Sequence, residues 1–453
     1  MELVIGRGAW QRDRGAFPPW RQENCLLEET KTDPKQYNIL SRPPLASYYS
    51  WGSGPVHGIF YKPGLFSGSV FAVIGGNLYK DGVSLGTIAG TGPVSWAGGN
   101  SELVVTRGTT ARSYNGSTLA NITFPDGANV RAVNYMARRF IFVRAGSGRF
   151  YWSALDNGRS IDALAYATAE SEQDELYDIK KSGDVFWMLG ANTGEGWVLT
   201  GDPDIPWTRI TMRNLNRGVQ AVGCAEEIEG TVYFISSDGM VCMIEKGAVR
   251  ISDSALEEKI RTSTTGSTYW FQYEGKPLLC LRLDSGTYVL DLALQNQPCV
   301  FSTSGRTNWA PKCAVNVGSE PLFGDDTAGT VWKFTEGNTT DSGSTTFERI
   351  FSAGLPGDGI PVSNIIVNGN SGAAASGAPT LDMRTSRDGG RTFSAWRSAL
   401  WGGAADYRRF ARFGPSGMFR APGFLAEFRM QSCIPFRVAS VRANESVAGR
   451  GRA

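Results

Sequence analysis

The chain repeats a short pattern of hydrophobic and polar positions. In each repeat, an apolar strand is followed by a glycine-containing turn and by a second strand that carries an aromatic or large apolar residue. The repeat starts are 32, 37, 45, 47, 46 and 44 residues apart. Most of these spacings lie near the period of about 40 to 50 residues at which propeller blades repeat. The starts are Phe71, Leu103, Phe140, Val185, Val232, Leu278 and Leu322.

An isolated hairpin of this kind is marginally stable because it leaves one apolar face in water. Radial stacking of successive sheets buries those faces and leaves only short edges. Asn115-Gly116 and Asp238-Gly239 supply the positive φ that tight hairpin turns require. The pattern therefore predicts an all-β chain with a β-propeller of six or seven blades over residues 46–335. An irregular β-sandwich with hairpins at chance spacing is the alternative.

A polar stretch at 335–346 predicts a boundary between domains. Strands with period-two alternation follow, so residues 346–445 predict a C-terminal β-sandwich module. Residues 1–45 predict an N-terminal arm, and residues 446–453 a flexible tail. The tract 163–178 predicts an extended connection with at most one helical turn.

Composition favours the same fold class. The chain has 453 residues with 56 glycines and only 19% charged residues, which is typical of many short strands joined by tight turns. Its net charge of +2 predicts no strong general attraction to nucleic acid or to acidic membranes. The charge is uneven, because residues 381–453 carry 13 arginines and five acidic residues, a net of +8, against −6 for residues 1–380. We expect no membrane-inserted segment, because no window approaches 18 apolar residues.

Candidate catalytic and metal chemistry is sparse. The seven cysteines form no CxxC pair, and His57 is the only histidine, so the sequence predicts no metal site and no cofactor. A Ser-His-Asp site would have to use His57, which stands among turn residues and is expected to be structural. The sequence contains no phosphate-binding loop of the G-x-x-x-x-G-K-[ST] type. We therefore expect a protein that is not an enzyme.

The stretch Ser386–Trp396, SRDGGRTFSAW, resembles an Asp-box, the hairpin that recurs in sialidase-type propellers. Asp388 is expected to cap the turn and Phe393 to anchor it. Only one copy of this hairpin occurs in the sequence. A sialidase-like glycoside hydrolase is therefore the weaker of two alternatives to a structural function. A carbohydrate-binding propeller of a receptor-binding tail fibre is the stronger alternative, although its blades would be expected to resemble one another more closely.

Two groups of charged residues are candidate interaction sites. The C-terminal arginines can either form an ordinary polar sheet face or pair with carboxylates of a neighbouring subunit or adaptor. The acidic loop can face a channel, meet a basic partner or simply remain solvated. Together with Trp20 of the arm, the interface candidates are Arg384, Arg387, Arg391, Arg408, Arg409, Arg412 and Arg420, and the acidic candidates are Glu170, Glu172, Asp174 and Glu175.

Four stretches together resemble a known family. Phe150-Tyr151-Trp152-Ser153 is followed by Asp162-Ala163-Leu164 and by ATAE at 167–170, and the chain also contains NILSRPPL at 38–45, GGNLYKDGVSLGTIAGTGPVSWAGG at 75–99 and an arginine-rich stretch at 407–443. Taken in their order along the chain, they resemble the tail hub or nozzle proteins of short-tailed double-stranded DNA phages. These are also described as packaged-DNA stabilisation or head-completion proteins.

The resemblance implies a structural virion protein of the phage tail. It implies a homohexameric tail nozzle or hub below the head-to-tail adaptor, which retains packaged DNA and conducts it during ejection without sequence-specific binding. Tail spikes or fibres would attach outside, and a tail needle is a further candidate partner. Assembly would take place in the cytoplasm of the bacterial host.

Overall fold

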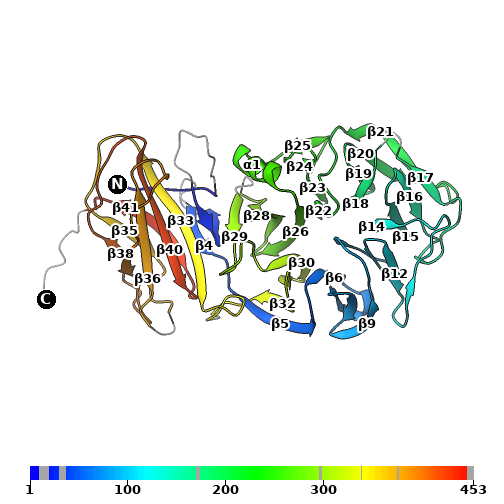
Figure 1. The fold of residues 1–453 in the computed structure, drawn as a ribbon, viewed down its shortest axis with the longest axis horizontal. Helices are drawn as coiled ribbons and strands as arrows, with labels where there is room; N and C mark the ends of the chain where they lie inside the picture. Colours follow the sequence, from blue (N-terminus) through cyan, green and yellow to red (C-terminus); the bar gives the residue numbers. More distant parts are fainter. Residues whose placement is uncertain are drawn as a thin grey trace. The chain divides into compact units, whose positions relative to one another are not determined.

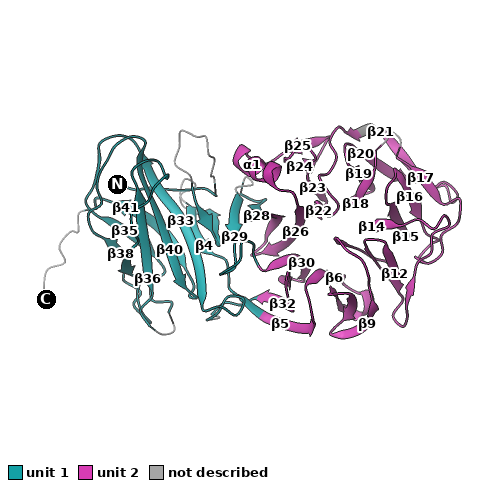
Figure 2. Ribbon diagram, in the orientation of Figure 1, with its two compact units in different colours: residues 1–46, 286–309, 334–453 teal, residues 47–285, 310–333 magenta. Residues whose placement is uncertain are grey.

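The computed structural model describes most of the chain, and almost all of its regular structure is β-strand. This confirms the predicted all-β class. The chain divides into two compact units (Figure 2), unit 1 with residues 1–46, 286–309 and 334–453, and unit 2 with residues 47–285 and 310–333. The described residues are 1–9, 20–29, 37–169, 174–294, 298–337, 339–374 and 377–445.

Unit 2 is the β-propeller, and its sheets follow one another around a centre (Figure 1). Within the described residues, the first strands of seven consecutive sheets each contact the next, and the last contacts the first. The circuit is therefore closed, with seven members, in agreement with the predicted propeller. These strands are β6 (Val56–Tyr61), β10 (Val94–Gly98), β14 (Val130–Met136), β18 (Leu176–Ser182), β22 (Ala225–Ile228), β26 (Gly266–Tyr273) and β30 (Pro311–Val317).

Each first strand pairs antiparallel with a second strand, and the pair continues into a sheet. The second strands are β7 (Val70–Ile74), β11 (Leu103–Arg107), β15 (Arg139–Arg144), β19 (Val185–Gly190), β23 (Thr231–Ile235), β27 (Lys276–Leu283) and β31 (Glu320–Asp325). In six of these sheets, the remaining strands are β8 (Asn77–Lys80), β9 (Val83–Thr87), β12 (Thr110–Tyr114), β13 (Leu119–Asn121), β16 (Arg149–Trp152), β17 (Tyr166–Thr168), β20 (Gly194–Leu199), β21 (Trp207–Leu215), β24 (Val241–Ile244), β25 (Ala248–Arg250), β32 (Gly329–Phe334) and β5 (Leu45–Gly52).

The repeat seen in the sequence corresponds to the second strands. All seven predicted starts fall inside these strands, one in each sheet. Second strands such as β7, β11 and β15 are almost wholly buried, which explains their nearly continuous apolar sequence. The turn after β23 shows how the hairpins close, since Gly239 has a φ of 81° and its N–H donates to the Ser236 carbonyl at 2.9 Å.

Within its described residues, unit 2 contains two helical segments. The 3₁₀ turn η1 (Leu65–Ser67) precedes β7, and helix α1 (Ser254–Thr262) lies between β25 and β26. The side chain of Asp253 caps α1 by accepting a hydrogen bond from the Leu256 N–H at 2.8 Å. Sequence reasoning missed α1, although the order of Asp253, Leu256 and Glu257 offered a helix-start signal. The tract 163–178 is extended in its described parts, as predicted.

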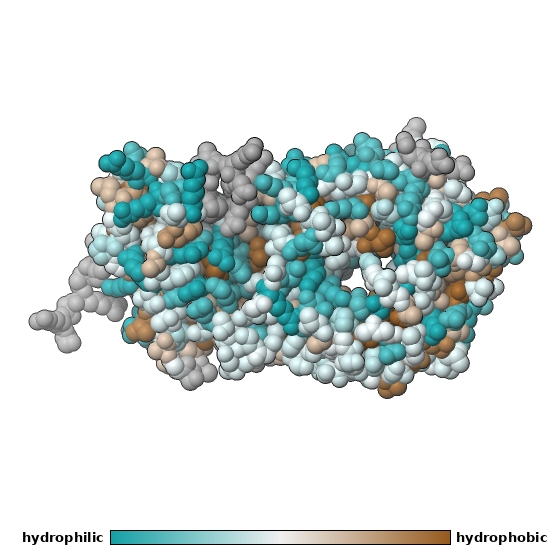
Figure 3. Space-filling model, in the orientation of Figure 1, coloured by the Kyte–Doolittle hydropathy of each residue, from teal (hydrophilic) through white to brown (hydrophobic). Residues whose placement is uncertain are grey.

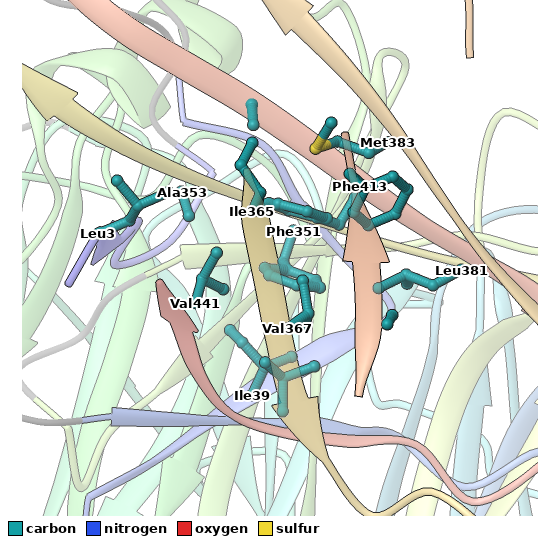
Figure 4. Close-up of a cluster of buried hydrophobic side chains, with 14 of the residues drawn as sticks. Leu3, Ile39, Phe351, Ala353, Ile365, Val367, Leu381, Met383, Phe413 and Val441 are labelled. Atoms are coloured by element: carbon teal, nitrogen blue, oxygen red, sulfur yellow. The ribbon is translucent and has the colours of Figure 1, made fainter. Parts of the chain in front are cut away.

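Unit 1 is a β-sandwich. The apolar faces of two sheets enclose a core whose members include Phe351, Leu381, Ile365, Val367 and Val441 (Figure 4). In one sheet, the strands that belong to unit 1 are, in order, β28 (Gly286–Asp291), β29 (Pro298–Phe301), β2 (Gln22–Glu23), β33 (Thr346–Pro356), β40 (Gly423–Ser432), β36 (Thr380–Ser386) and β37 (Arg397–Leu400), with β1 (Val4–Ile5) also paired to β33. The other runs β3 (Cys25–Glu29), β4 (Tyr37–Ser41), β41 (Arg437–Ala443), β35 (Ile365–Gly369) and β38 (Ala411–Phe413), and β34 (Ile360–Val362) pairs with β39 (Gly417–Phe419).

The structure divides the chain differently from the predicted domain boundaries. The N-terminal residues do not form a separate arm, because β1 and β2 pair with β33 while β4 pairs with β41. Residues 286–309 also belong to unit 1. These additions satisfy backbone hydrogen bonds and supply Leu3, Cys25, Leu27 and Ile39 to the sandwich core. The predicted tail at 446–453 lies outside the described residues.

Candidate interface surfaces

The arginine candidates all lie in unit 1, on β36, on β38 or in nearby connections. Arg384 is engaged within the unit, because its Nε and Nη2 donate to Glu427 Oε2 at 2.8 and 2.6 Å. Its guanidinium also lies over the Phe393 and Trp396 rings, 4.3 and 4.6 Å from their centroids. Arg384 therefore acts as an ordinary part of the sheet face in this structure.

The other arginine candidates are exposed. Arg409 pairs with Asp406 three residues earlier. Within the part of the chain that the structure describes, none of the others forms an ion pair. Those others are Arg387, Arg391, Arg408, Arg412 and Arg420. Five arginines thus remain available for carboxylates from outside the chain.

Arg387 shares a hollow with Arg397, an arginine that sequence reasoning did not select. The hollow has a volume of about 500 Å³ and lies between the turn after β36 and the connection from β38 to β39. Arg387 Nη2 donates to the Ser416 carbonyl at 3.0 Å, and Arg397 Nη2 donates to Ser416 Oγ at 2.6 Å. No local pattern in the sequence signals this pair, because only the fold brings residue 416 between them.

The Asp-box turn forms one wall of this hollow. Asp388 Oδ1 accepts from the N–H groups of Arg391 and Thr392 at 3.0 and 2.9 Å, and Thr392 Oγ1 donates to Asp388 Oδ2 at 2.6 Å. Burial opposes ionisation, but these hydrogen bonds and one from Ser386 outweigh it and lower the pKa of Asp388 to about 2. Asp388 thus caps the turn, and the turn lies in the sandwich unit rather than in the propeller.

Trp20 packs onto its own unit. A β-carbon added at Gly6 would lie 2.5 Å from the Trp20 ring, and one added at Gly354 would lie 3.4 Å from it. Trp20 also borders a small hollow with Leu355, Pro422 and Phe424. Because Trp20 is partly exposed, it remains a candidate for contact with a second molecule.

The two described residues of the acidic loop have local partners. Asp174 Oδ2 accepts from the N–H groups of Asn192 and Thr193 at 2.7 and 2.8 Å, so Asp174 caps the turn after β19. Glu175 pairs with Arg131 and accepts from the Gly146 N–H at 2.9 Å. Glu170 and Glu172 lie outside the described residues.

Glu175 also borders a second hollow, of about 540 Å³, where β10, β14, β18 and β22 begin. Among the described residues, four first strands have a β-bulge near their beginning. In each bulge one residue has no partner opposite it on the second strand, and these residues are His57, Arg131, Tyr177 and Lys312. Bulge residues of adjacent sheets meet, since Arg131 lies 5.2 Å from the centroid of the Tyr177 ring. The bulges therefore supply contacts between blades at one end of the propeller.

His57 is held between two cations. Its Nε2 lies 2.9 Å from Arg107 Nη2 and its Nδ1 lies 3.2 Å from Lys312 Nζ. Burial, followed by the charges of Lys312 and Arg107, lowers the pKa of His57 to about 4. A catalytic histidine is normally oriented by a carboxylate, and neither ring nitrogen has one as a partner among the described residues.

The titratable side chains do not gather into a metal-binding cluster. Across the described ranges, no group of three or more His, Cys, Asp or Glu side chains is placed to hold a metal ion. No helix in the described portion of the chain has the length and apolarity of a membrane span.

Comparison with known families decides the affiliation of the chain. Residues 53–338 match a family model described as Bacteriophage P22 Gp10, beta-propeller. The chain belongs to this family. The matched region covers the propeller except for β5 and ends before the arginine-rich segment of unit 1, so the family match says nothing about the arginine candidates.

A curated relative supports this affiliation. The chain is 26% identical over 292 residues to the tail hub protein gp10 of Salmonella phage P22, covering 58% of the chain and 61% of the relative. The chain thus spans less than two thirds of the length of that relative. Similar solved structures include the designed protein Ika8, with 12% identity, a TM-score of 0.43 and coverage of 73% of this chain and 99% of that one. The extracellular domain of a two-component system protein from B. thetaiotaomicron has 11% identity, a TM-score of 0.44 and coverage of 70% and 45%.

Proposed function

We propose that the chain is a structural component of a phage tail, in which copies form a sixfold tail hub or nozzle below the head-to-tail adaptor. The hub retains packaged DNA and conducts it during ejection, and tail spikes or fibres, with a tail needle as a further candidate, attach to it. The observation that carries the proposal is the family match over residues 53–338, which contain all of the propeller except β5, since the matched relative is a tail hub protein.

The electrostatics of the propeller suit a conduit. Each Lys or Arg that neutralises a DNA phosphate adds salt-dependent affinity, which would slow the passage of DNA. Unit 2 carries 23 basic and 27 acidic residues, a net of −4. Many of its cations already have partners, as Arg131 does with Glu175 and Arg282 with Asp326. Such a body would not grip a passing duplex.

A structural role also fits the polar groups of these surfaces. Asp388, Asp174 and Glu175 satisfy turns and neighbouring strands, and His57 joins three strands. Hydrophobic residues on the face shown in Figure 3 lie in separate small groups among hydrophilic ones. We infer that assembly relies on polar and charged contacts, which are typical of interfaces between preformed proteins.

Binding to phage heads tests the proposal. DNA-filled heads that carry the adaptor but lack this chain are mixed with the purified protein and separated by sedimentation. We expect the protein to co-sediment with these heads and to reduce nuclease digestion of the packaged DNA. Heads without the adaptor are the control and should bind no protein. Equal binding to both kinds of head, or no binding to either, would contradict the proposed function.

A further inference from the structure

The hollow shared by Arg387 and Arg397 concentrates positive charge without an internal counterion. Arg397 Nη1 donates to the Pro415 carbonyl at 3.0 Å, so both guanidinium groups are held at residues 415–416. Among the described residues, neither arginine forms an ion pair. By contrast, Arg384 pairs with Glu427 and Arg429 with Asp382 on the same sheet.

The two positively charged guanidinium groups at Ser416 repel each other, and an anion bound between them would offset this repulsion. A guanidinium has five N–H donors in a planar fork that matches a carboxylate. Arg387 uses one donor nitrogen in the contacts above and Arg397 uses two, so further donors remain for a ligand. The arrangement is therefore suited to a carboxylate.

The walls of the hollow are fixed before any ligand arrives. The Thr385 N–H donates to Ser394 Oγ at 3.0 Å, and the Ser394 N–H donates to the Thr385 carbonyl at 2.9 Å. Asp388 holds the adjacent turn, and Phe393 lies against Arg384. A preformed site loses little conformational entropy on binding, so this hollow can contribute to affinity as well as specificity.

Charge points to the source of the carboxylate. Unit 1 carries 22 basic and 16 acidic residues, a net of +6, whereas unit 2 has a net charge of −4. Two copies of one chain can therefore attract each other when unit 1 of one copy meets unit 2 of the next. Such a contact joins two different surfaces, and it generates a ring when its rotation closes.

We propose that the hollow of Arg387 and Arg397 binds a carboxylate-bearing segment of unit 2 from a neighbouring copy of this chain. The proposal rests on the proposed function and specifies the contact between subunits of the hub. Arg387 and Arg397 bind the carboxylate, and Ser416 holds the two guanidinium groups together. Phe393 and the Asp388 turn shape the site.

A charge-matched pair of variants tests the hollow. Arg387→Gln/Arg397→Gln removes both guanidinium groups, while Arg437→Gln/Arg442→Gln removes two exposed charges of unit 1 outside the hollow, which pair with Glu28 and Glu445. We expect the first variant to incorporate into adaptor-bearing heads at least about tenfold more weakly than wild type, and the second to incorporate nearly as wild type. Thermal unfolding of each variant checks that the fold is retained. Equal losses in the two variants, or no loss in the first, would overturn the proposal.

Photo-crosslinking identifies the partner independently of those variants. Benzoylphenylalanine replaces Ala395, an exposed residue that borders the hollow without holding either guanidinium group. Copies labelled with heavy and light isotopes are mixed, both in solution and on adaptor-bearing heads. We expect cross-links to acidic peptides of unit 2 that join heavy and light copies. Cross-links to another tail protein, cross-links only within one copy, or none in either setting would overturn the proposal. If the protein binds the heads but the labelled copies form none of these cross-links, the proposed role of the hollow is wrong, while the proposed function is retained.

Discussion

Arg42 shows how one residue can join distant parts of a chain. The side chain is fully buried, and its Nη1 and Nη2 donate to the two carboxylate oxygens of Asp341 at 2.9 and 2.8 Å. Its Nε donates to Asn24 at 2.8 Å, and Nη2 also donates to the Ser302 carbonyl at 3.0 Å. Arg42 therefore links the three segments of unit 1. These contacts give a structural role to the arginine of the NILSRPPL stretch.

Replacing Arg42 should destabilise unit 1 strongly. Arg42→Met leaves Asp341 buried without its counterion, and the loss of one member of a buried pair typically costs about 3 to 5 kcal/mol. Urea unfolding followed by tryptophan fluorescence measures the change. The double variant Arg42→Met/Asp341→Asn should recover part of the loss, because it removes the unpaired charge. A loss below about 1 kcal/mol for the single variant would contradict this role.

His57 should make stability depend on pH. Its pKa is about 4 in the folded protein, whereas an unperturbed histidine has a pKa of 6.5, so the unfolded chain binds the proton more readily between these values. The contribution of His57 to stability is therefore complete above pH 6.5 and is lost as pH falls toward 4. Because the ring is partly exposed, we expect an effect of about 1 to 2 kcal/mol.

The measurement compares wild type with His57→Gln. The difference in their free energies of unfolding is followed from about pH 7.5 to about pH 4.5, so that titrations common to both proteins cancel. Wild type should lose more stability than the variant as the pH falls. A difference that stays constant across this range would show that the environment of His57 does not disfavour its charged form.

Single residues were the least predictable part of the molecule. The capping role of Asp388 followed from its turn sequence, because its partners lie within four residues. The pairing of Arg384 with Glu427 and the burial of Asp341 in a predicted polar linker did not, because their partners are 43 and 299 residues away. Sequence reasoning recognises local turn chemistry more readily than long-range pairing.

Among the elements, the central hairpins were predictable and their neighbours were less so. Second strands such as β7 and β11 are buried on both sides and are followed by a short turn, so their hydrophobic pattern stands out. Several first strands begin with a bulge, which breaks the alternation at residues such as His57 and Arg131. The sequence therefore indicated six or seven repeats but neither the exact number of blades nor the contacts between them.

Closure of the circuit depends on a close approach between β31 and β6. A β-carbon at Gly324 would lie 2.6 Å from both Cys313 Sγ and Val56 Cγ1. Gly324→Ala should therefore strain the junction of the last and first blades and cost about 1 to 3 kcal/mol. Gly247→Ala is the control, since no heavy atom lies within 4 Å of its added β-carbon, and it should change stability by less than about 0.5 kcal/mol. Thermal or urea unfolding measures both, and equal effects would contradict a tight junction.

Across the whole molecule, the two units interleave in sequence. The chain passes from unit 1 to unit 2 and returns to unit 1 at 286–309 before completing the propeller. The propeller sheet β30-β31-β32-β5 also combines strands from distant parts of the chain, with β5 preceding all the other blades. Composition shifts and linkers can mark only contiguous boundaries, so they could not predict this arrangement.

The whole molecule also sets the role of its surfaces. The closed propeller buries the apolar faces of its sheets, and the sandwich does the same for unit 1. The surfaces that can contact partners include exposed arginines on unit 1, which has a positive net charge. The propeller has a negative net charge. We infer that the function lies in the contacts that these surfaces make in an assembly.

A reconstruction of adaptor-bearing phage heads with this protein added tests the central claim most directly. The account predicts a ring of six copies below the adaptor, with the seven-bladed propeller of each copy recognisable in the density. Heads imaged without the protein provide the comparison. Absence of added density at the adaptor, or a bound protein without sixfold symmetry, would contradict the account.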